Sequence, residues 1–294
     1  YSKNDKIILY MPKLLKLFYK YYLTGHPENS PVKQSDFPMY VENFDFEKYR
    51  KDIFAFQNQF FVEVAKTIEY KNEVFEIFRI ETKNNQSRKK LLVFATVHGN
   101  EFATALVIPR FLKDIVENPD FYKEWQIRII APANPVGLKY QSRYNKDGYD
   151  INRDFKDFKT DEAKLQRDEI DIFKPDILVS LHEHPHNGFM VFCTDVVPKV
   201  LQEKILNKLK EKNILLWGNP FFIKTPGAKP GITELGFFLK TFMFVFGIHS
   251  LGRFTRPKNI ADITSESYWN EKDTEKRIFP HMLVLQTIIQ NYKK

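Results

Sequence analysis

The chain has 294 residues, of which 43% are hydrophobic and 15% aromatic, so it can build a packed core and is not a disordered protein. Its single cysteine, Cys193, excludes an intramolecular disulfide framework and a cysteine-based metal site, and its longest apolar run, residues 242–248, is far shorter than the ~20 residues of a membrane-spanning helix. The net charge of +8 comes from lysines scattered along the chain, without the basic, aromatic-interleaved stripe of a nucleic-acid-binding module.

The N-terminal part of the chain, before residue 60, predicts little regular structure. A short helix fits residues 14–22, and a turn-rich stretch at residues 25–38 follows it. Two segments with β-branched and aromatic residues, 61–64 and 74–80, then predict an antiparallel strand pair joined at Asn72.

From residue 91 onward the pattern changes to alternating strands and helices. Short apolar runs at 91–97, 126–131 and 177–181 are separated by helical periodicity at 104–116 and 161–172. This alternation is typical of βα units in a sheet that is covered on both faces. It predicts a single three-layer α/β domain with a mixed, mostly parallel sheet.

No internal repeat and no linker divides the chain into independent units. We therefore expect residues 60–294 to form the main domain, with residues 1–59 as an N-terminal extension that packs on it. The sequence fits both cytoplasm and periplasm, because a single cysteine occurs in proteins of either compartment and removal of a signal preceding Tyr1 is compatible with it.

Polar residues follow two of the apolar runs. His98-Gly99-Asn100-Glu101 comes after the first, and His182-Glu183-His184 comes after the third. Because ligands collect at the carboxyl ends of parallel strands, His98 and His182 can converge on one edge of the sheet. Two imidazoles and a carboxylate, with a fourth position open to water, are the outline of a catalytic zinc site.

The segment between these clusters extends the pattern. It contains Arg143 in Gln-Ser-Arg-Tyr-Asn and Asn152-Arg153 in Asp-Ile-Asn-Arg-Asp, and Glu266 follows near the C-terminus in Ile-Thr-Ser-Glu. With these motifs in this order, residues from roughly 60 to 290 resemble the zinc metallocarboxypeptidases of the carboxypeptidase A-like clan. That clan also includes the succinylglutamate desuccinylase and aspartoacylase branch.

The resemblance implies a role for each motif. It implies one zinc ion per chain, held by His98, Glu101 and His182. Glu266 would be the general base that takes a proton from the zinc-activated water and returns it to the leaving amine.

The resemblance also implies three substrate contacts. Arg143 would polarise the scissile carbonyl and stabilise the oxyanion. Asn152 and Arg153 would hold the terminal carboxylate of the substrate. Arg253 and Arg256 lie in the segment that lines the family's side-chain pocket, and Arg253 there would favour an acidic or diaminopimelate-type terminal residue.

Glu234 competes with Glu266 for the role of general base. It lies in a Thr-Glu-Leu context that also occurs around the catalytic glutamate of the acyl-amino-acid branch. We favour Glu266, because a helical stretch with Arg277 and His281 follows it as the family implies, whereas Glu234 is expected to open an apolar helix.

Three neighbours of His182 have ordinary alternatives. His184 and His186 could compete as ligands but are expected in a surface loop, and Glu183 is either a partner that supports the ligands or a solvated carboxylate.

A mobile-loop tyrosine common in the clan has no counterpart, since no tyrosine occurs between Tyr149 and Tyr268.

These motifs predict a zinc-dependent metallocarboxypeptidase acting on a peptide substrate, with no nucleic-acid partner and no membrane span. The alternative is a zinc amidohydrolase of the desuccinylase and aspartoacylase type that acts on N-acyl amino acids. Only about thirty residues follow Glu266, too few for the extra β-rich domain usual in that branch. A non-catalytic binding protein that kept the fold is a third, weaker alternative.

Overall fold

The computed structural model describes residues 44–83, 88–218, 230–234 and 249–293. The strands are β1 (Phe60–Tyr70), β2 (Glu73–Thr82), β3 (Lys89–Ala95), β4 (Trp125–Ala131), β5 (Ile177–His184), β6 (Met190–Cys193), β7 (Ile232–Glu234) and β8 (Ala261–Tyr268). The helices are α3 (Phe46–Phe54), α4 (Ala103–Glu117), α5 (Pro119–Tyr122), α6 (Pro135–Tyr140), η2 (Ile151–Arg153), α7 (Asp161–Phe173), α8 (Lys199–Glu211), α10 (Leu251–Thr255), η3 (Arg256–Lys258) and α11 (Thr274–Asn291).

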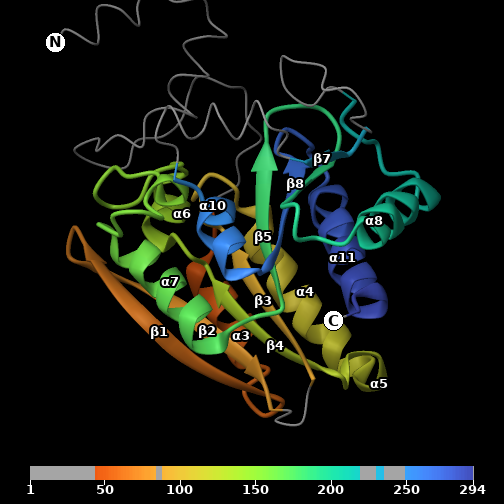
Figure 1. Ribbon diagram of the computed structural model, residues 1–294. Coiled ribbons are helices and arrows are strands. Elements are labelled where there is room, and N and C mark those ends of the chain that lie inside the picture. The colour runs from red at the N-terminus through yellow and green to blue at the C-terminus, as the bar shows by residue number, and fades with distance from the viewer. Residues whose placement is uncertain (1–43, 84–87, 219–229, 235–248, 294) are drawn as a thin grey trace, which may run out of the picture.

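Within the described residues the strands form one sheet of eight, in the order β1-β2-β4-β3-β5-β8-β6-β7. Its centre, from β4 through β3 and β5 to β8, is parallel, whereas β2 joins β4 and β6 joins β8 in antiparallel pairs. Helices cover both faces (Figure 1). The predicted α/β fold with a mixed, mostly parallel sheet is therefore confirmed.

The two faces of the sheet separate two apolar cores. On β3, Leu91 and Val93 pack with α4, α8 and α11, whereas Leu92 and Phe94 pack with α6, α7 and α10. This follows from the strand period of two, which sends successive side chains to opposite faces. The same alternation decides which residues of β5 and β8 can reach the site.

The predicted strands and helices named below are present, but their ends differ from the predicted ones. The predicted strand pair is present as β1 and β2, joined by Lys71 and Asn72, whose φ angles of 49° and 63° suit a tight hairpin. The predicted helices 104–116 and 161–172 are α4 and α7.

Strand β5 is longer than its apolar run predicts. It continues to His184, so His182 lies inside the strand and not after it. The extra residues pair with β8, where His182, Glu183 and His184 lie opposite Glu266, Ser267 and Tyr268. The apolar run ends at Leu181, but backbone pairing with β8 extends β5 through the polar residues that follow.

Two predicted helices fall where the structure gives no description. Residues 14–22 and the apolar segment after Glu234 lie outside the described residues, and Glu234 itself is the last residue of β7. Helix α3 packs on the sheet through Tyr49 and Ile53, which are 2% and 0% exposed. The division into an extension and a main domain stays a prediction.

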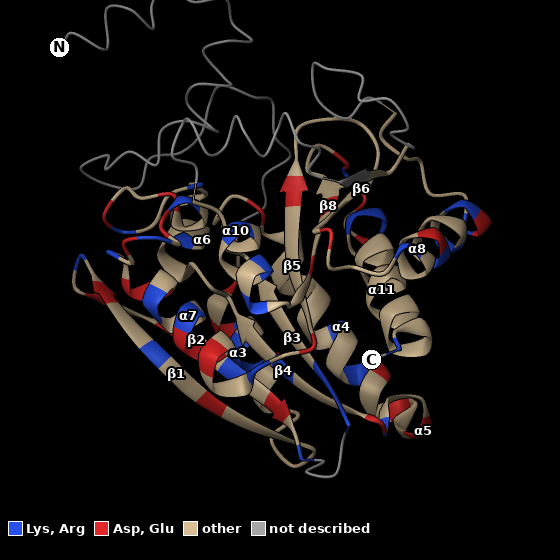
Figure 2. Ribbon diagram, viewed as in Figure 1, with Lys and Arg blue, Asp and Glu red and all other residues tan. Residues whose placement is uncertain are grey.

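The charges of the chain are distributed over the molecule. In Figure 2, basic and acidic residues are interspersed along β1 and α8. Among the residues that the structure describes, no helix combines the length and the apolar character that a membrane span requires.

Asp262 is a buried carboxyl near the start of β8. It is 2% exposed, and Thr255 Oγ1 donates a hydrogen bond of 2.6 Å to its Oδ2. Burial raises the pKa of Asp262 from 3.8 to about 7, although the hydrogen bond from Thr255 opposes the shift. The folded state therefore keeps a proton that the unfolded chain loses, so this group's contribution to stability is full below pH 4 and is lost as the pH rises through 7.

We expect Asp262→Asn to remove this pH dependence. At pH 8 the variant should be more stable than the wild type by about 2–4 kcal/mol, because each unit of pKa shift corresponds to about 1.4 kcal/mol, and near pH 4 the two should be similar. Urea unfolding from pH 4 to 8 measures the difference. Asp171→Asn, at an exposed ion pair with Lys258, is the control and should stay near the wild type. Parallel profiles for Asp262→Asn and the wild type would contradict the prediction.

Candidate metal centre

The first two candidate ligands lie between β3 and α4. Strand β3 ends at Ala95, and His98 and Glu101 occupy the turn that leads into α4, where Glu101 N donates to His98 O at 3.2 Å. Gly99 lies against α6, since a Cβ atom at Gly99 would be 1.9 Å from the carbonyl carbon of Gly137. The turn can therefore pack this closely only with glycine between the two ligands.

His182 of β5 completes a compact group with His98 and Glu101. The two Nδ1 atoms are 3.1 Å apart, and the Glu101 oxygens lie 2.7 Å from His98 Nδ1 and 2.8 Å from His182 Nδ1. All three residues are buried, and their ligand atoms lie within 4.8 Å of one another. The structure thus brings together the three residues that the sequence predicted as ligands.

The outer nitrogen of each imidazole has its own partner. His98 Nε2 lies 3.1 Å from Asp150 Oδ1 and its Nδ1 lies 2.7 Å from Glu101 Oε1, so each ring nitrogen has a carboxylate that can accept a hydrogen bond from it. His182 Nε2 lies 2.9 Å from Ser180 Oγ, which can accept its proton in the same way. With a metal ion bound at both Nδ1 atoms, the Nε2 protons would point to Asp150 and Ser180, which is the tautomeric state that metal ligation requires.

The protonation states also suit a metal. Burial raises the pKa of Glu101, but its interactions with His98 and His182 outweigh this and lower it to about 2. Burial lowers the pKa of His182 despite the opposing carboxylate of Glu101. An anionic carboxylate beside neutral imidazole is the donor set of a divalent transition metal, and tetrahedral bonds of 2.0–2.1 Å separate two ligand atoms by about 3.3 Å, close to the separation of the two Nδ1 atoms.

Glu266 lies beside this group on the next strand. It pairs with His182 in the β5–β8 register, and matching positions on parallel strands point to the same face. Burial, and then the charge of Glu101, raises its pKa to about 8, with Arg143 and Arg153 opposing the shift. It is a carboxyl whose proton can be exchanged near neutral pH.

The rival base, Glu234, lies farther away along the sheet. Its backbone pairs with Cys193 of β6, and Cys193 pairs in turn with Ile263 of β8, three positions before Glu266. This backbone register separates Glu234 from His182 by two intervening strands.

Arg143 and Asp150 form the wall next to His98. Arg143 Nε donates to Asp150 Oδ2 at 2.8 Å, and Arg143 Nη1 lies 3.3 Å from His98 Nδ1 and 4.0 Å from Glu101 Oε1. Burial opposes the charge on Arg143, but Asp150 and Glu101 raise its pKa above its ordinary value. Asp150 therefore contacts both Arg143 and the candidate ligand His98.

The candidate substrate-binding residues lie on neighbouring short helices. Asn152 and Arg153 belong to η2, which Asp150 caps through a hydrogen bond from Asn152 N to Asp150 Oδ1. Asn152 Oδ1 accepts from Leu251 N at 2.9 Å, which ties η2 to α10, the helix that carries Arg253. The neighbouring Arg256 instead forms an exposed ion pair with Asp195.

The structure corrects the expectation for His184, agrees with that for His186 and excludes one of the two alternatives for Glu183. His184 is not in a surface loop, because it is 4% exposed on β5 and its Nε2 donates to Gly188 O at 2.9 Å. His186 lies exposed in the loop after β5, as expected, and its ring stacks on Trp217 at 4.7 Å between ring centroids. Glu183 is not solvated but 2% exposed, with two hydrogen bonds from Arg277.

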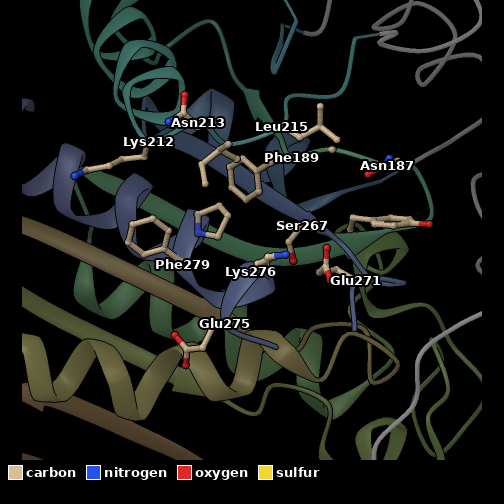
Figure 3. Close-up of a pocket in the computed structure, with 14 residues that line it drawn as sticks. Asn187, Phe189, Lys212, Asn213, Leu215, Ser267, Glu271, Glu275, Lys276 and Phe279 are labelled. Atoms are coloured by element: carbon tan, nitrogen blue, oxygen red, sulfur yellow. The ribbon is translucent and has the colours of Figure 1, made fainter. Parts of the chain in front are cut away.

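A separate hollow of about 570 Å³ lies near the ends of α8 and α11 (Figure 3). Phe189 and Phe279 contribute apolar surface to it, and Lys212, Lys276 and Glu275 contribute charge. None of the candidate ligands lines it, so it is distinct from the metal centre.

A family model described as the succinylglutamate desuccinylase/aspartoacylase catalytic domain matches residues 87–178, a span that includes His98, Glu101 and Arg143 and ends before His182. None of the curated proteins compared matches the sequence.

Solved structures match over most of the chain. A candidate metallopeptidase from Shewanella denitrificans OS217 superposes with a TM-score of 0.67 at 18% identity, covering 87% of this chain and 97% of its own. A metallo-carboxypeptidase from Burkholderia cenocepacia gives 0.60 at 16% identity, covering 85% and 69%. This chain therefore has the fold of these metallopeptidase and metallo-carboxypeptidase structures.

A third structure of the clan contains a bound ligand. It is a metallo-carboxypeptidase from Pseudomonas aeruginosa in complex with (2-guanidinoethylmercapto)succinic acid, with a TM-score of 0.57 at 16% identity and coverage of 85% and 69%. The predicted resemblance to this clan, including its desuccinylase and aspartoacylase branch, is thus confirmed, and the site has a buried His-Glu-His group that can hold a metal ion.

We expect zinc to stabilise the chelator-treated protein. At a free concentration 100-fold above Kd, ligand linkage contributes about 2.7 kcal/mol, which for a domain of this size raises Tm by about 5–10 °C. His182→Ala should abolish most of this shift, whereas His186→Ala, which removes a ring stacked on Trp217, should keep it. Thermal melts with and without zinc make the comparison, and an equal shift in both variants would contradict it.

Proposed function

We propose that this chain is a zinc-dependent metallocarboxypeptidase that hydrolyses a C-terminal amide bond. The observation that carries the proposal is the convergence of His98 Nδ1, His182 Nδ1 and the Glu101 carboxylate, with Glu266 in register beside His182. A buried ligand group and an adjacent carboxyl of raised pKa are the features expected of a hydrolytic metal site.

Zinc fits this donor set. Two imidazoles and one carboxylate provide three protein ligands and leave a position open, as in catalytic zinc sites. A bound zinc ion would lower the pKa of a coordinated water towards ~7 and polarise the substrate carbonyl. Asp150 and Ser180 would hold the two imidazoles in the ligating tautomer.

Glu266 is the proposed general base and then the general acid. Its carboxylate would take a proton from the attacking water and pass it to the leaving amine nitrogen, so the same oxygen atoms serve both halves of the reaction. A pKa of about 8 in the metal-free site would fall when a dication is bound nearby, which favours the ionised form that a base requires.

The arginines of the site suit an anionic substrate. Arg143 would stabilise the oxyanion that develops on the carbonyl, and Arg153 with Asn152 would bind the terminal carboxylate. Arg253 on α10 would favour an acidic or diaminopimelate-type side chain. The ligand of the Pseudomonas aeruginosa relative, a succinic acid derivative, supports a substrate class that carries carboxylates.

The alternative is an amidohydrolase of the desuccinylase and aspartoacylase type. It is favoured by one observation, the match of that family's catalytic domain to residues 87–178. It uses the same residues on an N-acyl amino acid in place of a peptide. Release assays on peptides and on N-acyl amino acids, run in parallel with zinc-loaded protein, distinguish the two functions.

We expect Glu266→Gln to lower kcat by about 10²–10⁴-fold, the range for loss of general acid–base catalysis, without loss of bound zinc. The Gln side chain keeps the shape but cannot accept the proton. Glu234→Gln is the control and should stay active. Amino-acid release with parallel metal analysis is the measurement, and full activity in Glu266→Gln with loss in Glu234→Gln would transfer the role to Glu234.

We expect Arg153→Ala to weaken recognition of a free terminal carboxylate. A charge-assisted hydrogen bond contributes about 1.5–3 kcal/mol, so kcat/KM should fall about 10–100-fold on a peptide acid. On the matching peptide amide, which wild type should cleave poorly, the variant should lose little. An equal loss on both substrates would argue against a carboxylate contact.

A further inference from the structure

A buried ion pair between Arg277 and Glu183 lies next to the candidate metal centre. Arg277 of α11 donates from Nε and from Nη2 to the two carboxylate oxygens of Glu183 on β5, each at 2.7 Å. Their side chains are 1% and 0% exposed. Glu183 is the residue after His182, so the pair begins one position from a candidate ligand.

The pair lies on the face of the sheet opposite the ligands. His182 and Glu183 pair with Glu266 and Ser267 across β5 and β8, and successive strand residues point to opposite faces. His182 and Glu266 therefore face the site, whereas Glu183 and Ser267 face α11. Ser267 Oγ donates to Glu183 Oε1 at 3.3 Å, which links the two strands on this second face.

The same carboxylate also reaches the start of α4. Ala103 N donates to Glu183 Oε2 at 3.1 Å, and the Arg277 guanidinium lies over the Phe102 ring at 4.2 Å from its centroid. Phe102 and Ala103 directly follow Glu101. Arg277 thus contacts Phe102, which follows the candidate ligand Glu101. Its partner Glu183 follows the candidate ligand His182.

Stability alone gives little reason for such a pair. The loss of hydration on burying two full charges largely offsets their attraction, and apolar replacements of such pairs are often neutral or stabilising. The two parallel hydrogen bonds of Arg277 instead fix the position and orientation of the Glu183 carboxylate, because each bond has a defined donor and acceptor.

We propose that Glu183 and Arg277 are positioning residues that hold Glu101 and His182 at ligand distance before a metal binds. The inference rests on the proposed metal site. Without the pair, α4 and β5 keep their apolar packing but lose the polar link that fixes Glu101 relative to His182. The expected effect is on metal affinity, in the 10–100-fold range typical of residues that support ligands.

The test measures zinc affinity by competition with a chromogenic chelator, with thermal melting in parallel. We expect Glu183→Gln, which keeps the side-chain shape and removes the charge, to bind zinc 10–100-fold more weakly than the wild type. Arg277→Lys, which keeps the charge and removes the fork, should lose affinity in the same direction with less change in Tm.

Glu169→Gln is the matched control. Glu169 of α7 is also 1% exposed, and it is paired with Arg79 and Arg128 of β2 and β4, away from the candidate ligands. It should lower Tm but keep wild-type zinc affinity, which separates positioning from general destabilisation.

The outcomes are distinct. Wild-type zinc affinity in Glu183→Gln and Arg277→Lys, or an equal loss of affinity in Glu169→Gln, would overturn the positioning role and leave the proposed function intact. If Glu183→Gln does not fold, Arg277→Lys decides between the same two results. A wild-type chain that binds no zinc would overturn both proposals.

Discussion

Parallel pairing of β3, β5 and β8 is the constraint on which the site depends. Because these strands run in the same direction, their carboxyl ends meet at one edge, and the turn after β3 emerges next to His182 and Glu266. The ligands come from segments more than 80 residues apart, since His182 is 84 positions from His98. Only the register of the sheet brings them within hydrogen-bond distance.

The buried carboxylates at this edge differ in their cationic partners. Asp150 has Arg143 as its cation, and Glu183 has Arg277. Glu101 is anionic and 1% exposed, yet its nearest guanidinium nitrogen, Arg143 Nη1, is 4.0 Å away. A buried carboxylate is costly unless it is paired or bound to a metal. The partners of Glu101 are the imidazoles of His98 and His182, and a divalent cation bound among the three would supply a positive charge that neutral imidazoles do not.

Much of this arrangement could be predicted from the sequence, for physical reasons. Strands buried on both faces are apolar along their length, so β3, β4 and the first part of β5 stand out from their surroundings. A histidine and a glutamate three residues apart after such a run also form a local pattern. The site residues could therefore be predicted where an apolar run or a short motif lies next to them in the sequence.

The rest depends on contacts that leave no local pattern. The end of β5 is polar, and only pairing with β8 shows that His182 and His184 belong to the strand. The partner of Glu183 is 94 residues away, so nothing near it distinguishes a buried, paired carboxylate from a solvated one. Ser180 was missed because a serine two residues before a ligand is unremarkable until the strand places both on one face.

Asn152 shows how this framework extends from metal binding to substrate recognition. Its Oδ1 accepts the Leu251 N–H, so the acceptor half of its amide already joins η2 to α10. The other half is an NH₂ group, which can only donate. A donor beside the guanidinium of Arg153 suits a carboxylate, which can only accept, and does not suit an ammonium group. The hydrogen bond that fixes α10 therefore also sets the polarity of the proposed substrate-binding residues, in agreement with a substrate that ends in a free carboxylate.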